Sequence, residues 1–141
     1  GWTVQDAEAF DLDGRWDALR DNDDPTSVAM VALFAGNNLD LYIIAWGQHY
    51  VGTYQYADGA IVYTISEAYQ AYTDGHSWEA GNLDASTLTL SNGYDWYQMD
   101  PVTLANYKED LQEFSFLLQD GNNSATSALF GIENLVFTKV N

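Results

Sequence analysis

Two alternating segments joined by Asp58-Gly59 restrict the possible folds of this chain more than any other feature. Residues 49–56 and 60–66 alternate large apolar or aromatic side chains with small or polar ones, which is the two-residue period of a β-strand. The Asp-Gly pair favours the tight turn of a β-hairpin. With Ala57 opposite Ala60, one face of this hairpin gathers the following residues: Tyr50, Gly52, Tyr54, Tyr56, Ile61, Tyr63 and Ile65.

Two further hairpins are predicted from the same signals. Residues 28–35 and 39–46 are rich in aliphatic side chains and flank Gly36-Asn37-Asn38, a turn sequence that accepts positive φ. Residues 87–99, TLTLSNGYDWYQM, carry Asn92-Gly93, the strongest hairpin signal in the chain. Pairing Ser91 with Tyr94 predicts an inner face that contains Leu88, Leu90, Asp95, Tyr97 and Met99.

The last third of the chain predicts one helix and further strand structure. Asp100-Pro101 is typical of a helix start. Apolar side chains follow at helical spacing, which predicts a short helix near residues 101–112: Leu104, Tyr107, Leu111 and Phe114. After it come an apolar stretch at 114–118, a turn region QDGNNSATS at 119–127, and a final strand near 133–140.

These segments indicate a single all-β domain over residues 1–141. Eight to ten strands joined mostly by short turns predict an antiparallel meander. Such a meander hides its edges either by closing into an up-and-down β-barrel or by forming a two-sheet sandwich. The strand pattern alone leaves both architectures open.

Charge and composition exclude several kinds of partner. The chain has 21 acidic residues against four Lys and Arg, a net charge of −17, which repels nucleic acid and anionic membrane surfaces. Its longest apolar run, residues 27–36, is far shorter than the roughly 20 residues of a membrane-spanning helix. Cysteine is absent, which excludes disulfides and thiolate metal sites. We expect no nucleic-acid partner, no membrane insertion of this domain, and a monomer.

The opening strand, FDLDGRWDAL at residues 10–19, places Gly14 two positions before Trp16. A glycine inside a strand allows a bend and a close backbone approach. This Gly-x-Trp resembles that of the lipocalins and the wider calycin superfamily, most closely the small lipocalin-like domains of bacterial surface lipoproteins. The resemblance implies an antiparallel barrel of about eight strands, in which Trp16 closes one end beneath Lys139 of the last strand. Without such closure, Trp16 would be a core aromatic residue of an edge strand.

The same resemblance implies non-enzymatic binding of a small apolar or mixed-polarity ligand inside the barrel, without a cofactor. It also implies an exported bacterial protein, either periplasmic or anchored at the cell surface as a lipoprotein. The chain opens on Gly1 without an initiating Met, which is in keeping with a removed export signal. We therefore expect an exported domain.

Amphipathic tyrosine rings around a concave surface are typical of a small-molecule pocket, which a carboxylate on the same face would anchor. We predict that the ligand contacts Phe34, Leu41, Ile43, Tyr54, Tyr63, Leu90, Asp95 and Tyr97. The structural alternative is a filled core whose tyrosines reach solvent at the rim. Exposed tyrosines and tryptophans would instead form the sugar platform of a carbohydrate-binding β-sandwich. An interaction or inhibitor domain without a small ligand is the third possibility.

No specific catalytic or metal-binding motif occurs in the sequence. His49 and His76 are the only histidines, and we interpret His76 as a solvated loop residue. The acidic run at residues 21–25 lacks the ligand spacing of a calcium-binding loop. A glycosidase-type carboxylate pair stays open because acidic residues are so abundant. We expect no catalytic residues and no metal.

Overall fold

The tyrosine-rich hairpin has the predicted register. In the computed structural model, which describes residues 12–140, this hairpin consists of β4 (Gln48–Ala57) and β5 (Ala60–Tyr72). Ala57 pairs with Ala60, and Tyr54 pairs with Tyr63. The register shifts between Val51 and Gly52, and such a bulge bends the strand and increases its twist. The large side chains of this hairpin therefore face the interior, and the threonines face outward.

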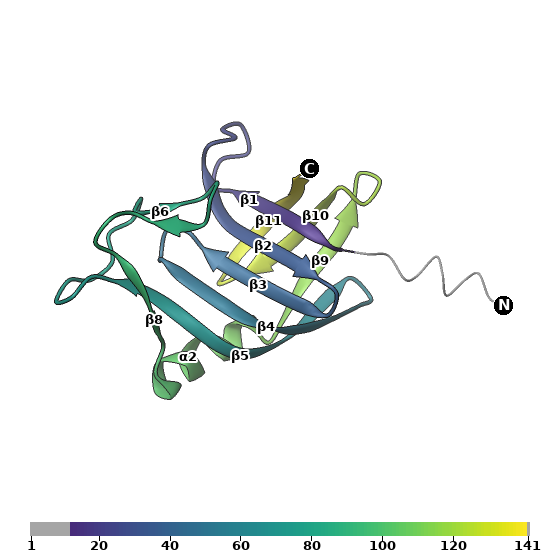
Figure 1. Ribbon diagram of the computed structural model, residues 1–141. Helices are drawn as coiled ribbons and strands as arrows, with labels where there is room; N and C mark the ends of the chain where they lie inside the picture. Colours follow the sequence, from purple (N-terminus) through teal and green to yellow (C-terminus); the bar gives the residue numbers. More distant parts are fainter. Residues whose placement is uncertain (1–11, 141) are drawn as a thin grey trace.

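Eight antiparallel strands close into a barrel (Figure 1). Besides β4 and β5, they are β1 (Gly14–Leu19), β2 (Val28–Ala35), β3 (Asn38–Ile43), β9 (Glu113–Gln119), β10 (Ser124–Leu129) and β11 (Ile132–Val140). Around the ring the order is β1, β2, β3, β4, β5, β9, β10 and β11, and each strand pairs with the next, including β5 with β9 and β11 with β1. The prediction of an all-β antiparallel barrel of about eight strands with one short helix is confirmed. The first two residues of the predicted opening strand, 10–11, lie outside the described residues.

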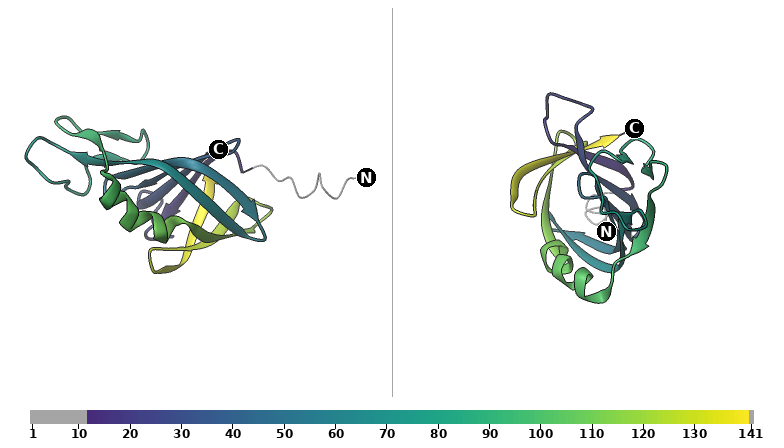
Figure 2. Two further views of the ribbon diagram at one scale, coloured as in Figure 1. Left: turned by 90° about the horizontal axis from the view of Figure 1, so that it is seen from below. Right: turned by 90° about the vertical axis from the view of Figure 1, so that its left-hand side faces the viewer.

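The helix α2 (Pro101–Leu111) completes one part of the barrel wall. β5 pairs with β9 only from Ala60 to Val62. Beyond Val62, α2 lies beside β5, as the end-on view of Figure 2 shows. Leu104 and Leu111 are buried. The helix begins as predicted, because Asp100 accepts a hydrogen bond from the Thr103 amide at 2.8 Å and thereby caps the first turn.

One end of the barrel is filled by aromatic rings around Trp16. The Trp16 side chain is fully buried, and its indole N–H donates to the Leu12 carbonyl at 2.8 Å. Lys139 Nζ lies 5.8 Å from the ring centroid, within the range of a cation–π contact. Gly14 has a φ of 125°, and a Cβ there would lie 3.2 Å from Lys139 Cε. A glycine at this position thus allows the first and last strands to approach closely.

The predicted hairpin over residues 87–99 does not form, and this prediction is wrong. β7 (Thr89–Leu90) pairs with β6 (Leu83–Asp84), whereas β8 (Asp95–Gln98) pairs with the far end of β5. A turn does occur at Asn92-Gly93, since the Tyr94 amide donates to the Ser91 carbonyl at 3.1 Å. The strands on its two sides have separate partners, so the predicted inner face of this segment does not exist as a unit.

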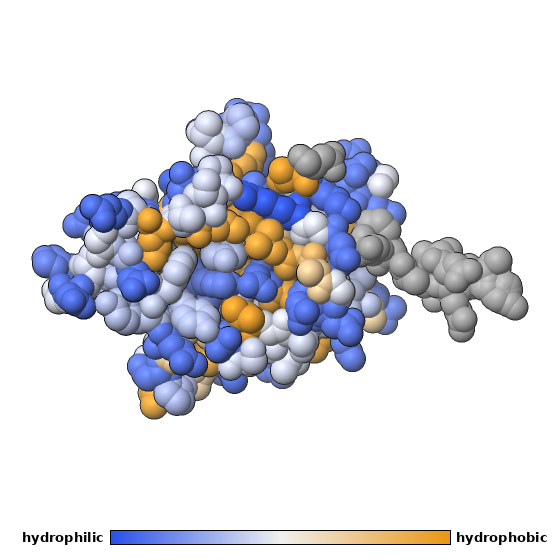
Figure 3. All heavy atoms as spheres, viewed as in Figure 1, coloured by the Kyte–Doolittle hydropathy of each residue, from blue (hydrophilic) through white to orange (hydrophobic). Residues whose placement is uncertain are grey.

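The reason lies in a second apolar cluster on the outside of the barrel. Val31, Ile44 and Leu83 are buried there, with Leu88, Leu90, Trp78 and Trp96 packed against them. Apolar surface over β2 beside this segment is visible in Figure 3. Because β2 is apolar on both faces, its outer face also needs cover. Residues 78–96 provide that cover, which outweighs the local hairpin preference.

A second correction concerns residues 124–127, which we predicted as turn and which belong to β10. Ser124 pairs with Gln119 of β9 and with Thr138 of β11. Ala125 has a low strand preference, and serines such as Ser124 and Ser127 favour turns, so pairing on both sides decides their conformation.

Candidate functional site

Five of the eight predicted ligand contacts lie together inside the barrel. Phe34, Leu41, Ile43 and Tyr63 are buried in the main core, and Tyr54 packs against that core. The ring centroids of Phe34 and Tyr54 are 5.0 Å apart, and those of Trp16 and Phe116 are 5.3 Å apart. The half of the barrel near Trp16 is therefore filled by ring-to-ring packing.

The inward-facing tyrosine hydroxyls already have protein partners. Tyr50 donates to Gln48 Oε1 at 2.6 Å, Tyr56 to the Phe116 carbonyl at 2.8 Å, and Tyr63 to the Leu39 carbonyl at 2.7 Å. Burial raises the pKa of Tyr50 and of Tyr63, so both phenols stay neutral donors. These hydroxyls are used to stabilise the barrel and are not free to hold a ligand.

Ser127 differs from the other polar groups of the interior. It is 1% exposed and lies on β10 between Phe116 of β9 and Leu135 of β11. Its neighbours two positions away on the same face, Ala125 and Leu129, are apolar and buried. Its Oγ has no hydrogen-bond partner, and an unpaired buried hydroxyl costs about 1–3 kcal/mol. Ser127 was not predicted as an interior residue, because residues 119–127 have the composition of a turn.

The barrel end opposite Trp16, which we call the mouth, is bridged by Trp46 and Phe130. Trp46 lies in the β3–β4 connection and Phe130 in the β10–β11 connection, on opposite sides of the strand order. Their ring centroids are 5.0 Å apart at an interplanar angle of 67°. Phe130 has a φ of 53°, which is uncommon for a bulky residue. Trp46 is 42% exposed, so the bridge meets solvent.

Below the mouth, the interior is lined by aliphatic and thioether side chains. Met30, Ile43, Met99, Leu104 and Leu135 are all buried in the main core. Both methionines of the described chain lie in this set. Methionine adapts its shape readily, so this half can rearrange more easily than the aromatic half around Trp16.

The other three predicted contacts lie outside the interior. Leu90 packs in the outer apolar cluster. Asp95 is exposed, and its Oδ1 accepts a hydrogen bond from the Trp96 amide at 2.8 Å. Tyr97 is 41% exposed. They were predicted to face inward from the 87–99 hairpin, and its absence separates them from the five interior residues.

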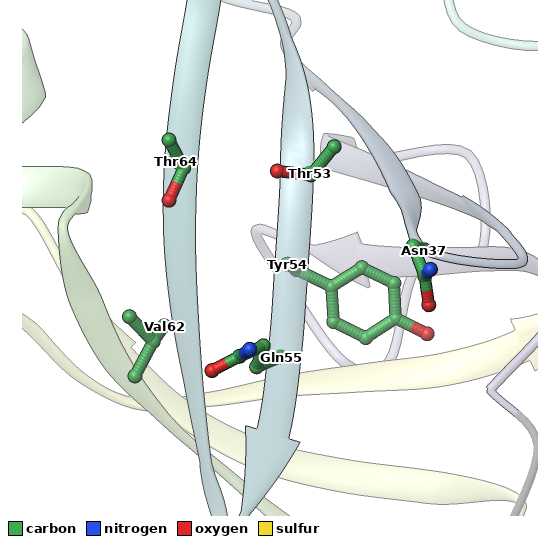
Figure 4. A pocket seen from close by; sticks show the side chains of 6 residues that line it. All are labelled: Asn37, Thr53, Tyr54, Gln55, Val62 and Thr64. Atoms are coloured by element: carbon green, nitrogen blue, oxygen red, sulfur yellow. The ribbon is translucent and has the colours of Figure 1, made fainter.

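An open groove follows the outer face of the β4–β5 hairpin (Figure 4). It has a volume of about 440 Å³ and is lined by Asn37, Thr53, Tyr54, Gln55, Val62 and Thr64. Thr53 and Gln55 come from β4, and Val62 and Thr64 from β5. The groove offers amide and hydroxyl groups without a charged side chain, which suits only a neutral polar molecule.

Each of the two histidines contacts one aspartate residue. His49 Nε2 lies 2.8 Å from Asp40 Oδ2 on the outer face, while His76 Nδ1 lies 3.1 Å from the Asp74 carbonyl oxygen in an exposed turn. Within residues 12–140, no three His, Asp or Glu side chains are grouped so that they could hold a metal ion.

In the part of the chain that the structure describes, no helix has the length and apolar character needed to cross a membrane. Known protein families, curated proteins and solved structures were compared with this chain, and none of them matches it.

Proposed function

We propose that this protein binds a small, mainly apolar ligand with one polar group inside the mouth half of the barrel, and that it does so without catalysis. The observation that carries this proposal is the unpaired Oγ of Ser127. A hydroxyl buried among apolar side chains without a hydrogen bond lowers stability, and a bound partner removes that cost. Ser127 lies where the two halves meet, between Phe116 of the aromatic half and Leu135 of the mouth half. A carbonyl, hydroxyl or amine of a ligand that enters from the mouth supplies its partner.

The lining of the mouth half supports an apolar ligand body. Met30 and Met99 provide side chains that shift to make room, because methionine has a flexible chain and a polarisable sulfur. Trp46 and Phe130 form the entrance, and their contact joins two turns rather than two strands. The ligand therefore enters by separating these two rings, and the closed ring of strands stays intact.

The lipocalin-like function expected from Gly14 and Trp16 is of the same class. In this proposal the aromatic end around Trp16 is the structural base of the barrel, and the mouth half holds the ligand. The tyrosines Tyr54 and Tyr63 then act as the floor of the site. Their hydroxyls do not bind ligand.

Ser127→Ala tests the proposal because it should not lower the stability of the ligand-free protein but should weaken ligand binding. In the ligand-free protein, removing an unpaired buried hydroxyl leaves the free energy of unfolding unchanged or raises it by about 1 kcal/mol. In the ligand-bound protein, the same change removes a hydrogen bond and weakens binding about tenfold. The unfolding free energy is measured in urea, and binding is measured with the fluorescent neutral probe N-phenyl-1-naphthylamine.

Thr126→Ala is the matched control, since Thr126 precedes Ser127 on β10 and its side chain lies on the other face. It should leave probe affinity unchanged. Native mass spectrometry of the purified protein would identify a ligand that is retained during purification. If Ser127→Ala destabilised the ligand-free protein and left probe binding unchanged, the hydroxyl would have a purely structural role and the proposal would be wrong.

A further inference from the structure

A second hollow lies outside the barrel, where β5 ends and β8 runs beside it. It has a volume of about 440 Å³ and is lined by residues 72–77 and Tyr97. The ring centroids of Tyr72 and Tyr97 are 6.1 Å apart at an interplanar angle of 48°, and each residue is 41% exposed. The two rings form an angled aromatic wall that is open to solvent.

Two carboxylates place negative charge beside this wall. The Tyr97 hydroxyl donates to Asp74 Oδ1 at 3.1 Å, which ties the Asp74 side chain to the rim of the hollow. Asp95 pairs with Tyr72 across β5 and β8. The hydrogen bond to Asp74, with the negative charges of Asp74 and Asp95, raises the pKa of Tyr97. Both carboxylates therefore act on the same ring.

No Lys or Arg is among the residues that line this hollow, and His76 is the one histidine among them. Over residues 12–140, the ion pairs join Arg15 to Asp17 and His49 to Asp40. Lys139 lies over Trp16 at the other end of the barrel. The whole chain contains only four Lys and Arg.

We propose that this hollow binds a small organic ammonium ion, with the positive group against the faces of Tyr72 and Tyr97 and paired with Asp74. A cation is attracted to an aromatic face within about 6 Å of the ring centroid, and rings 6.1 Å apart allow one group to reach both. The net charge of −17 raises the local concentration of cations.

Other classes of ligand would interact with either the tyrosine rings or the carboxylates, but not with both. A neutral sugar would stack on a tyrosine ring but gain nothing from the charge of Asp74 and Asp95. A metal ion needs several convergent oxygen or nitrogen ligands, and the described residues contain no such group. An organic ammonium ion alone uses the rings and the carboxylates together.

Choline and its neutral isostere 3,3-dimethylbutan-1-ol test the proposal, because they share a shape and differ in charge. Isothermal titration should detect choline binding, and choline should shift the ring resonances of Tyr72 and Tyr97 in NMR spectra. We expect the isostere to bind about tenfold more weakly or not at all. Raising the salt concentration should weaken choline binding, because the charges are exposed.

Asp74→Asn keeps the side-chain shape and should weaken choline binding about tenfold. Asp23→Asn, in the exposed β1–β2 loop, changes the net charge by the same amount and should leave binding unchanged. Ser127→Ala should also leave it unchanged, which separates this site from the barrel interior. Equal binding of choline and its isostere, equal losses in the two Asp variants, shifts away from Tyr72 and Tyr97, or no binding of choline would each overturn the proposal.

Discussion

His49 is held on the outer face of the barrel by an aromatic ring and a carboxylate. Its ring is stacked on that of Tyr42, with centroids 4.0 Å apart and planes 9° apart. The Trp96 ring lies 5.8 Å away, in the segment that covers this face. Burial lowers the pKa of His49, and this outweighs the opposite effect of Asp40 at 2.8 Å. The folded protein therefore favours the neutral imidazole.

This lowered pKa predicts a loss of stability in acid that depends on His49. As the pH falls through the ordinary value of 6.5, the unfolded chain takes up a proton that the folded chain resists, so unfolding becomes easier. The stability that neutral His49 contributes is fully present above pH 6.5 and declines as the pH falls below it. Urea unfolding between pH 7.5 and pH 5 should show that wild type loses more stability than His49→Gln. Parallel pH profiles would contradict this expectation, and His76→Gln controls for the loss of one histidine.

At the scale of elements, two similar turn signals had different outcomes. Asp58-Gly59 joins segments that pair with each other, so local sequence was sufficient to predict their register. Asn92-Gly93 also makes a turn, but β8 pairs with β5 and β7 with β6. Both faces of β2 are apolar in the sequence itself. The segment that covers the outer face is distant in the sequence, so local signals could not identify it.

The bulge of β4 provides a prediction at this scale. A Cβ at Gly52 would meet the Thr64 carbonyl oxygen and lie 2.8 Å from Ile65 Cα, and backbone atoms cannot move aside as a flexible side chain can. Gly52→Ala should therefore lower the free energy of unfolding by about 3 kcal/mol. Urea unfolding measures the change, with the exposed neighbour Thr53→Ala as a control. A loss as small as that of the control would show that β4 and β5 separate easily at this point.

At the scale of the whole molecule, the way the strands close into a barrel determines which parts of the candidate site could be predicted. Alternation predicted Tyr54 and Tyr63 as interior residues, and the aliphatic hairpin predicted over residues 28–46 supplied Phe34, Leu41 and Ile43; all five lie on regular strands. The mouth contact between Trp46 and Phe130 depends on closure of the ring, which brings two turns far apart in sequence together. Ser127 depends on a strand with weak local signals. Neither feature has a signature in a short stretch of sequence.

The net charge of −17 predicts a salt response of the whole molecule. Compact folding brings like charges together, and this repulsion is screened as the Debye length falls from about 30 Å at 0.01 M to about 10 Å at 0.1 M salt. The midpoint of thermal unfolding should therefore rise when NaCl is increased over this range. A midpoint that stayed constant or fell would show that the acidic residues are spread widely enough for their repulsion not to matter.

The pairing of β1 with β11 has a further consequence for how quickly the chain reaches its native state. Arg15 pairs with Val140, so this ladder joins positions separated by almost the whole described chain. Contacts of such sequence separation require much of the chain to be ordered first, and proteins rich in them fold slowly, in milliseconds to seconds. During that interval β1 and β11 are open edges that can pair with another molecule. The edges of β1 and β11 are therefore exposed to aggregation until the ring closes.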